Sequence, residues 1–453
     1  MTTLTAARGQ MAVSLVFHII FAAIGIGLPM LLVIVEGLYV RTGRTHYLQL
    51  ARKWAKATGL LFAIGAVSGT ALSFELGLLW PRYMELTGAS VGHAFGLEGF
   101  AFFIEAIFIG LYLYGWERLG PVAHWLCGVV IAISGAASGM LVLAVNAWMQ
   151  QPVGFTLDAA GHVVTTDPMA IFRSYSWYIM GLHSTLACYI AVSFAVAAVY
   201  AEGWLKGRRD VYHRSAIVVS LAVGALAALA QPLAGDRLAQ FVFRTQPAKF
   251  AAMEGHFRTQ PYAPVNIGGL PDESIGKTRY AIKIPGALSF LATHHPSTTI
   301  EGLDDIPRNL WPNVGLTHFM FDLMVGCGSV LSLLSLWFWL RYLRRRSTLL
   351  DGRWLVRLIL WCGPLGFIAL EAGWFVTEAG RQPWIIHGVL KTADAVTPSP
   401  AVYASFFGFV ALYLLLAATL LLLLRFIGRQ SPQEFAEQEN RTEPLPARGD
   451  VTT

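Results

Sequence analysis

Nine apolar runs, each about 20 residues long or longer, restrict what this chain can fold into more than any other feature. A helix of about 20 apolar residues crosses a hydrocarbon core of about 30 Å, whereas barrel strands would alternate apolar and polar residues. Only 13% of the 453 residues are charged, against about 25% in ordinary soluble domains. We therefore predict an all-α polytopic membrane protein. Its nine spans lie near 12–40, 54–80, 94–116, 122–148, 178–202, 214–234, 314–340, 354–377 and 401–427.

The cations alternate between loops. The loops after the first, fifth and seventh predicted spans are rich in Arg and Lys, and the loops between them are poorer in both. Because cytoplasmic loops carry the excess of Lys and Arg, the N-terminus is predicted outside and the C-terminus in the cytoplasm. The net charge of +6 is explained by these loops, so no nucleic-acid partner is expected.

Two polar segments interrupt this pattern of short loops. Residues 235–313 form a long outer loop between the sixth and seventh spans, and connections of that length are usually functional or disordered. Residues 428–453 contain few apolar side chains and are predicted to form a disordered cytoplasmic tail. Residues 1–427 are then one membrane-embedded domain.

Ionisable residues inside the predicted spans each need an explanation, since a charge at mid-membrane costs at least about 2.5 kcal/mol. A histidine or glutamate there can also join two helices by hydrogen bonds, and a methionine can simply pack in the core. The predicted topology nevertheless places one set in the outer half of the spans, as expected for a layer of cofactor ligands. Histidine, methionine and carboxylate are ordinary axial ligands of heme. The set is His18, Glu98, His183, Met324 and Glu378.

Four segments resemble subunit I of the cytochrome bd quinol oxidases. GWERLGPVAHW begins at Gly115, NAWMQQP at Asn146, QPAKFAAME at Gln246 and GRQPW at Gly380. The resemblance covers the chain up to about residue 427. Because the outer loop lacks a long insertion, the chain is most similar to the short-loop group, which includes the cyanide-insensitive relatives.

The resemblance implies three hemes and a ligand for each. His183 and Met324 match the pair that holds a low-spin heme b. His18 and Glu378 match ligands of the two high-spin hemes, which are a heme b and a heme d, or a further heme b. A heme with both axial positions filled transfers electrons but does not bind oxygen.

The resemblance also implies roles for polar residues around the hemes. Lys249 and Glu254 match residues tied to quinol oxidation, and we expect both in an outer aqueous loop away from the irons. Glu98 matches a heme-side carboxylate and Glu105 a member of a proton path. Arg381 is the arginine that neighbours the heme carboxylate in the family.

The implied function is a terminal oxidase subunit of the bacterial cytoplasmic (inner) membrane. Ubiquinol or menaquinol would be oxidised at the outer face and oxygen reduced to water, with a proton gradient generated without pumping. The expected partners are a polytopic subunit II and, in some members, a small single-span subunit.

Two alternatives stay open. The segment before Glu98 is shorter than in familiar members, and Asp322 stands where a well-known branch carries arginine. Both departures are compatible with a divergent heme-binding paralogue that has another heme set or electron donor. Intramembrane Glu and His residues also occur in the proton relays of ion-coupled transporters.

Overall fold

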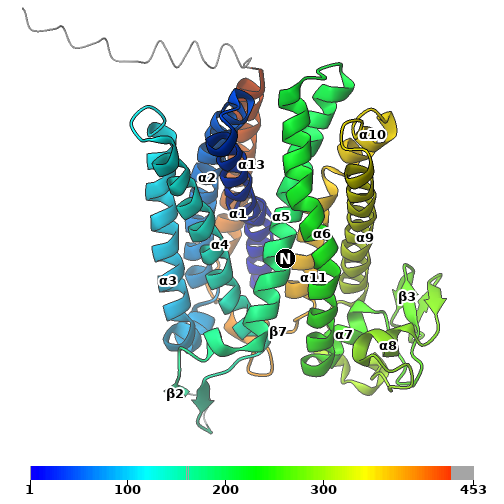
Figure 1. Ribbon diagram of the computed structural model, residues 1–453. Helices are drawn as coiled ribbons and strands as arrows, with labels where there is room; N and C mark the ends of the chain where they lie inside the picture. The colour runs from blue at the N-terminus through cyan, green and yellow to red at the C-terminus, as the bar shows by residue number, and fades with distance from the viewer. Residues whose placement is uncertain (1, 160, 162, 430–453) are drawn as a thin grey trace, which may run out of the picture.

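The computed structural model describes residues 2–159, 161 and 163–429. Within these residues, nine helical segments are long and apolar enough to cross a membrane, which confirms the predicted number. The segments stand side by side in one bundle (Figure 1). They are α1 (Thr3–Thr42), α2 (Thr45–Leu79), α3 (Pro81–Tyr114), α4 (Pro121–Gln150), α5 (Tyr175–Leu205), α6 (Val211–Thr245), α9 (Val314–Arg344), α10 with α11 (Arg353–Cys362 and Leu365–Ala379) and α13 (Val402–Arg429).

Most helices begin earlier than their apolar runs because polar caps and prolines set the first turn. Thr2 accepts a hydrogen bond from the backbone of Thr5 at the start of α1. Pro81 opens α3, where a missing N–H costs nothing. Glu98 therefore lies midway along α3 and not near its start, where the predicted span placed it.

The predicted eighth span, 354–377, is two helices. α10 ends at Cys362 and α11 begins at Leu365, so the break contains Pro364, which has no N–H to continue the helix. Gly363 permits a close approach, since a Cβ there would lie 2.5 Å from Cβ of Ala198 in α5.

The bundle consists of two groups of helices, one built around α1 and α4 and the other around α5. α1 packs along α2, α4 and α13, and α3 packs along α4. α5 packs along α6 and α10, and α11 packs between α9 and α5. Contacts of α1 and α4 with α5 join the groups, so the ligands predicted on α1, α5, α9 and α11 all lie on neighbouring helices.

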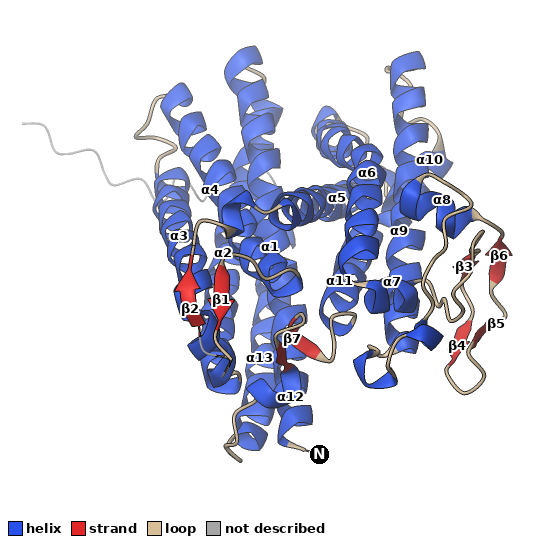
Figure 2. Cartoon of the chain, turned by 90° about the horizontal axis from the view of Figure 1, so that it is seen from below, coloured by secondary structure: helices blue, strands red, loops and turns tan. Residues whose placement is uncertain are grey.

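The connection between α6 and α9 is folded and shorter than predicted, because α6 continues as a helix to Thr245. β3 pairs with β6 and β4 with β5, which makes one nested antiparallel hairpin. The remaining hairpins, β1–β2 and β7–β8, lie at the same end of the bundle (Figure 2). The elements of the connection are α7 (Pro247–Met253), β3 (Val265–Ile267), β4 (Leu270–Asp272), β5 (Lys277–Arg279), β6 (Ile282–Ile284) and α8 (Ala287–Thr293). Elsewhere are β1 (Phe155–Leu157), β2 (Val163–Thr166), β7 (Trp384–Ile386), β8 (Leu390–Lys391) and α12 (Thr392–Ala395).

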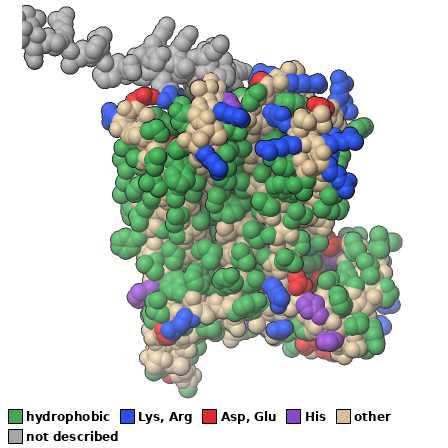
Figure 3. Space-filling view, viewed as in Figure 1, with side chains coloured by type: hydrophobic (Ala, Val, Ile, Leu, Met, Phe, Trp, Pro, Cys, Tyr) green, Lys and Arg blue, Asp and Glu red, His purple; other side chains and the backbone are tan. Residues whose placement is uncertain are grey.

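Lys and Arg side chains gather at the end of the bundle opposite α7 and α8 (Figure 3). We term this the basic end, formed by the α1–α2, α5–α6 and α9–α10 connections, and the opposite end the loop end. Of the predicted tail, 428–453, only residues 428 and 429 are described, as the last residues of α13. The rest lies outside the described residues.

Candidate functional site

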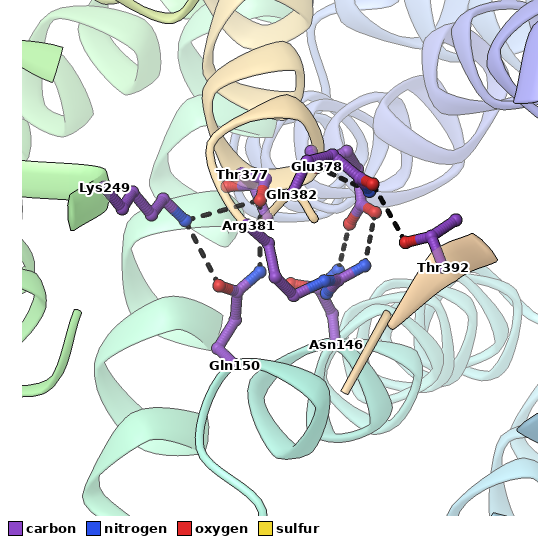
Figure 4. A network of polar contacts seen from close by, with 8 residues as sticks. All are labelled: Asn146, Gln150, Lys249, Thr377, Glu378, Arg381, Gln382 and Thr392. Carbon is purple, nitrogen blue, oxygen red and sulfur yellow. Dashed lines mark hydrogen bonds and ion pairs between the residues drawn. The ribbon is translucent and has the colours of Figure 1, made fainter. Parts of the chain in front are cut away.

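A cluster of hydrogen bonds at the loop end joins α11 to α4 (Figure 4). One carboxylate oxygen of Glu378 accepts from Nδ2 of Asn146 at 2.6 Å, and the other accepts from Nη2 of Arg381 at 2.6 Å. Arg381 is only 3% exposed, so its charge is neutralised mainly by this buried ion pair. A carboxylate has about four lone-pair sites, so Glu378 keeps acceptor sites beyond these two bonds.

Lys249 extends the same cluster from α7. Its ammonium donates to Oε1 of Gln150 at 3.2 Å and to the carbonyl of Thr377 at 3.3 Å. Its stem lies against Gly380, where a Cβ would come within 3.1 Å of it. Burial, with Arg381 close by, lowers the pKa of the Lys249 ammonium to about 7. The expectation that Lys249 lies in water away from the ligands is wrong, because α7 folds back onto the end of α11.

Glu254 ends α7 and is also buried. Burial, together with the nearby Asp322 carboxylate, raises the pKa of Glu254 to about 8. Its backbone carbonyl accepts a hydrogen bond from Asn266 of β3 at 2.9 Å. The two residues matched to quinol oxidation therefore sit at the two ends of one short helix, neither of them in open water.

Asp322 ties the hairpin to the helix that carries Met324. Its Oδ2 accepts the backbone N–H of Gly268 at 2.7 Å, in the turn between β3 and β4. One turn earlier, His318 donates from Nδ1 to the carbonyl of Met253 at 2.8 Å. The aspartate at this position therefore anchors the α6–α9 connection onto α9.

His18 is held between α1 and α2. Its Nδ1 lies 3.0 Å from the hydroxyl of Ser68, and Gly69 faces the ring so closely that a Cβ would lie 2.8 Å from Cε1. A partner that fixes one ring nitrogen and orients the other is the usual environment of an iron-ligating histidine.

His183 and Met324 each face a glycine on a neighbouring helix. A Cβ on Gly235 of α6 would lie 3.5 Å from the ring of His183, and one on Gly373 of α11 would lie 3.0 Å from the sulfur of Met324. Gln231 donates to the backbone carbonyl of His183 at 3.1 Å, with its amide nitrogen 3.3 Å from Nε2.

The residues present fit a heme group. Buried polar atoms without a partner cost about 1–3 kcal/mol each, and several lie beside the predicted ligands among the described residues. Nε and Nη1 of Arg381 are buried donors that suit an anionic propionate. Oε1 of Gln231 and both carboxylate oxygens of Glu371 are also buried without a hydrogen-bond partner among the described residues, and they are acceptors.

Glu98 and Glu105 lie on the face of α3 that packs on α4. Oε1 of Glu98 accepts from the hydroxyl of Ser138 at 3.0 Å. Glu105 is 5% exposed, and its Oε1 is buried without a partner among the described residues. A Cβ on Gly135 would lie 3.1 Å from that oxygen and 2.9 Å from the carbonyl of Gly25, so the glycine lets the helices approach closely here.

Asn146, Gln150, Gln231 and Ser68 received no role from the sequence. Asn146 and Gln150 stand four positions apart in α4, hence on one face, and contact Glu378 and Lys249 respectively. That spacing within the NAWMQQP segment was a usable signal. Ser68 and Gln231 contact ligands on other helices, and their own surroundings in the sequence contain no such signal.

Comparisons with known proteins identify the family of the chain. Residues 6–432 match the family described as cytochrome bd terminal oxidase subunit I. A Bacillus subtilis (strain 168) protein named "Putative cytochrome bd menaquinol oxidase subunit I" is 35% identical, covering 95% of this chain and 98% of the relative. The "Cytochrome bd-II ubiquinol oxidase subunit 1" of Escherichia coli (strain K12) is 31% identical, covering 86% of this chain and 88% of the relative.

A solved structure gives the same result for the fold. The bd oxidase from Geobacillus thermodenitrificans contains a chain that superposes with a TM-score of 0.89 at 36% identity. The superposition covers 94% of the present chain and 98% of that chain. With the family match spanning nearly all the described residues, this chain belongs to the cytochrome bd terminal oxidase subunit I family.

Proposed function

We propose that the chain is the subunit of a terminal respiratory oxidase that oxidises membrane quinol and reduces oxygen to water. The observation that carries the proposal is the shared cluster at the loop end. Lys249, matched to quinol oxidation, and Glu378, matched to a heme ligand, contact the same turn of α11 and the same face of α4. Electron donor and acceptor sites would therefore be close enough for direct transfer.

The ligands divide among three hemes. His183 and Met324 would hold a low-spin heme b, and His18 and Glu378 would each hold one high-spin heme, a heme b and a heme d or a further heme b. When bound, the hemes supply one-electron transfer and an iron position that oxygen can occupy. Arg381 would hold the charge of Glu378 and of a propionate nearby.

Proton release from quinol would use the residues of α7. Glu254 and Lys249 have pKa values of about 8 and about 7, so each takes up or releases a proton easily near neutral pH. Both sit at the loop end, so the protons would leave on that side. Ubiquinol and menaquinol both suit this chemistry, and the two relatives above carry names that divide between them.

Protons for oxygen reduction would come from the opposite side through Glu105 and Glu98. The two acids are two helical turns apart on one face of α3, so they form consecutive steps toward the predicted ligands. Charge separation would then arise from uptake at one end and release at the other, without a pump.

The proposed setting is the bacterial inner membrane with the basic end in the cytoplasm, in accord with the gathering of Lys and Arg in Figure 3. The N-terminus would lie outside and the C-terminus inside. Subunit II, with a small single-span subunit in some members, is the expected partner. Exposed apolar side chains on α2, α3 and α13, such as Phe74, Phe100 and Leu414, face lipid or such a partner.

A heme analysis of the purified complex tests the proposal. We expect a pyridine hemochrome assay and a reduced-minus-oxidised spectrum to show low-spin and high-spin hemes, together with quinol-dependent oxygen uptake. Absence of heme bands would contradict the oxidase and favour an ion-coupled transporter. Hemes without quinol oxidation would instead identify a divergent paralogue with another donor.

A further inference from the structure

A ladder of polar side chains continues from Glu105 toward the basic end. On α3, Glu98, Glu105 and Tyr112 are spaced seven positions apart, which is about two turns, so they share one face. Ser138 and Gly135 of α4 contact the first two. The third is the start of a buried cluster that the function proposed above does not use.

This cluster consists of Glu36 of α1, Tyr112 of α3 and His124 of α4, and we term it the loading cluster. Tyr112 donates its hydroxyl to Oε2 of Glu36 at 2.5 Å, and Nδ1 of His124 lies 2.6 Å from Oε1 of Glu36. Nε2 of His124 lies 2.9 Å from the backbone carbonyl of Tyr112. The Glu36 and His124 side chains are each 3% exposed.

The hydrogen-bond pattern of His124 shows where the cluster can hold a proton. Both ring nitrogens face oxygen atoms that accept, a carboxylate and a backbone carbonyl. Nε2 donates to the backbone carbonyl, and the bond between Nδ1 and Oε1 needs one further proton, carried by either the imidazole or the carboxyl. Without that proton both atoms are acceptors, so this bond is the place where the cluster would hold a proton.

Glycines on α4 let the ladder pack against the backbone. A Cβ on Gly128 would lie 3.0 Å from the Tyr112 ring and 3.8 Å from Oε2 of Glu36. Seven positions later, a Cβ on Gly135 would lie 3.1 Å from Oε1 of Glu105 and 2.9 Å from the carbonyl of Gly25. α1 and α4 therefore approach α3 closely at the loading cluster and at Glu105.

The basic end of the ladder lies close to solvent. The Trp116 ring stacks on His124 with centroids 3.9 Å apart. The Arg52 guanidinium lies over the same Trp116 ring at 5.3 Å and pairs with Glu117 at 2.5 Å. The Glu117 side chain is 66% exposed, so one aromatic ring separates the loading cluster from a charged pair in contact with water.

We propose that the loading cluster takes up protons at the basic end and delivers them to Glu105. The inference rests on the proposed function and adds to it the site where protons are first held. Tyr112 and Glu105 are about 10.5 Å apart along the helix axis, a span that two or three bridging waters cover. Oε1 of Glu105, buried and unpartnered among the described residues, is an acceptor for the last of them.

A cluster that only joined helices would not need this chemistry. A buried ion pair is often no more stabilising than apolar residues of the same volume, so packing alone gives no reason for three titratable groups. The groups facing the cluster are Glu36, Tyr112, His124 and Cys127, with Arg52 and Glu117 beyond Trp116.

The test uses the purified complex with its partner subunit and hemes, with Glu36→Gln as the main variant. Glutamine keeps the shape and accepts from Tyr112 but cannot carry a proton. We expect quinol oxidation at least about tenfold slower, an unchanged reduced-minus-oxidised heme spectrum and a larger solvent deuterium isotope effect. The rate should increase less with rising pH than in wild type, because proton uptake then limits turnover, and Glu36→Asp should restore most of the rate.

Tyr200→Phe is the matched control for the loss of a buried hydrogen bond. Tyr200 accepts from Nε1 of Trp54 at 2.9 Å in another part of the bundle, and its loss should leave the pH profile and isotope effect unchanged. A Glu36→Gln rate within about twofold of wild type, with the same pH profile, would overturn the inference. So would a changed heme spectrum in that variant, which identifies a structural role. Wild type without hemes or quinol oxidation would instead overturn the proposed function itself.

Discussion

At this site the burial and contacts of single residues depend on the folded surroundings more than on the type of segment to which each residue belongs. Lys249 belongs to a polar segment between two spans, yet it is 6% exposed and contacts the turn that carries Glu378. His18 and Met324 belong to apolar runs, yet each is opposed by a glycine that leaves room for the side chain. The predictions at this scale therefore concern what each side chain touches.

Replacing His183 by Ala or Met324 by Leu should abolish the low-spin heme signal while the chain still inserts in the membrane. Both side chains are matched to one ligand pair, and a six-coordinate heme needs both. The measurement is the reduced-minus-oxidised spectrum of the purified complex. Cys327→Ala, at a buried position three residues after Met324, should keep the full signal. A normal low-spin spectrum in either ligand variant would show that the pair is wrongly assigned.

Quinol oxidation should increase as the pH rises through about 8, the pKa of Glu254. Burial raises this pKa, so at pH 7 only about one tenth of the carboxyl is ionised and able to accept a proton. Raising the pH increases the ionised fraction and therefore the rate. Glu254→Gln should remove this increase, whereas Glu273→Gln, an exposed carboxylate of the same connection, should retain it. Steady-state rates between pH 6 and 9 decide the matter, and an unaltered profile in Glu254→Gln would exclude Glu254 as the acceptor.

At the scale of elements, the apolar runs predicted the number and order of the membrane helices because burial in lipid requires about 20 such residues in a row. They did not predict where helices begin, since Thr2 and Pro81 outside the runs set the first turns. The fold of the α6–α9 connection also could not be predicted from the sequence. Its hairpin depends on contacts such as Gly268 with Asp322, which join residues far apart in the chain.

α2 offers a test of how closely a helix must approach the ligand that it faces. Gly69→Ala should reduce the high-spin heme signal, because the new Cβ would lie 2.8 Å from Cε1 of His18 and push the ring aside. Alanine normally stabilises a helix by about 1 kcal/mol relative to glycine, so any loss here reflects the contact. Gly77→Ala on the same helix meets nothing within 4 Å and should keep the signal. Equal spectra in the two variants would contradict the inference that Gly69 positions the His18 ring.

At the scale of the whole molecule, the distribution of charge predicts the orientation. With the basic end in the cytoplasm, Ser274→Cys at the loop end should react with a membrane-impermeant maleimide in intact spheroplasts. Ser347→Cys at the basic end should react only after lysis. Both serines are exposed and all four native cysteines are buried, so the background should be low. The reverse labelling pattern would invert the topology and the direction of proton movement with it.

The proposed path of protons crosses the whole bundle, and Glu105 is one of its steps. Glu105→Gln keeps the hydrogen-bonding shape of the side chain but cannot carry a proton. In proteoliposomes we expect oxygen reduction to slow at least about tenfold, with proton uptake at the basic end slowed equally. Protons released at the loop end should still equal the electrons taken from quinol, because that release depends on α7 and not on α3. If Glu105 only joined α3 to α4, turnover would stay near that of wild type, and protons would have to reach the oxygen site by a route that avoids this ladder.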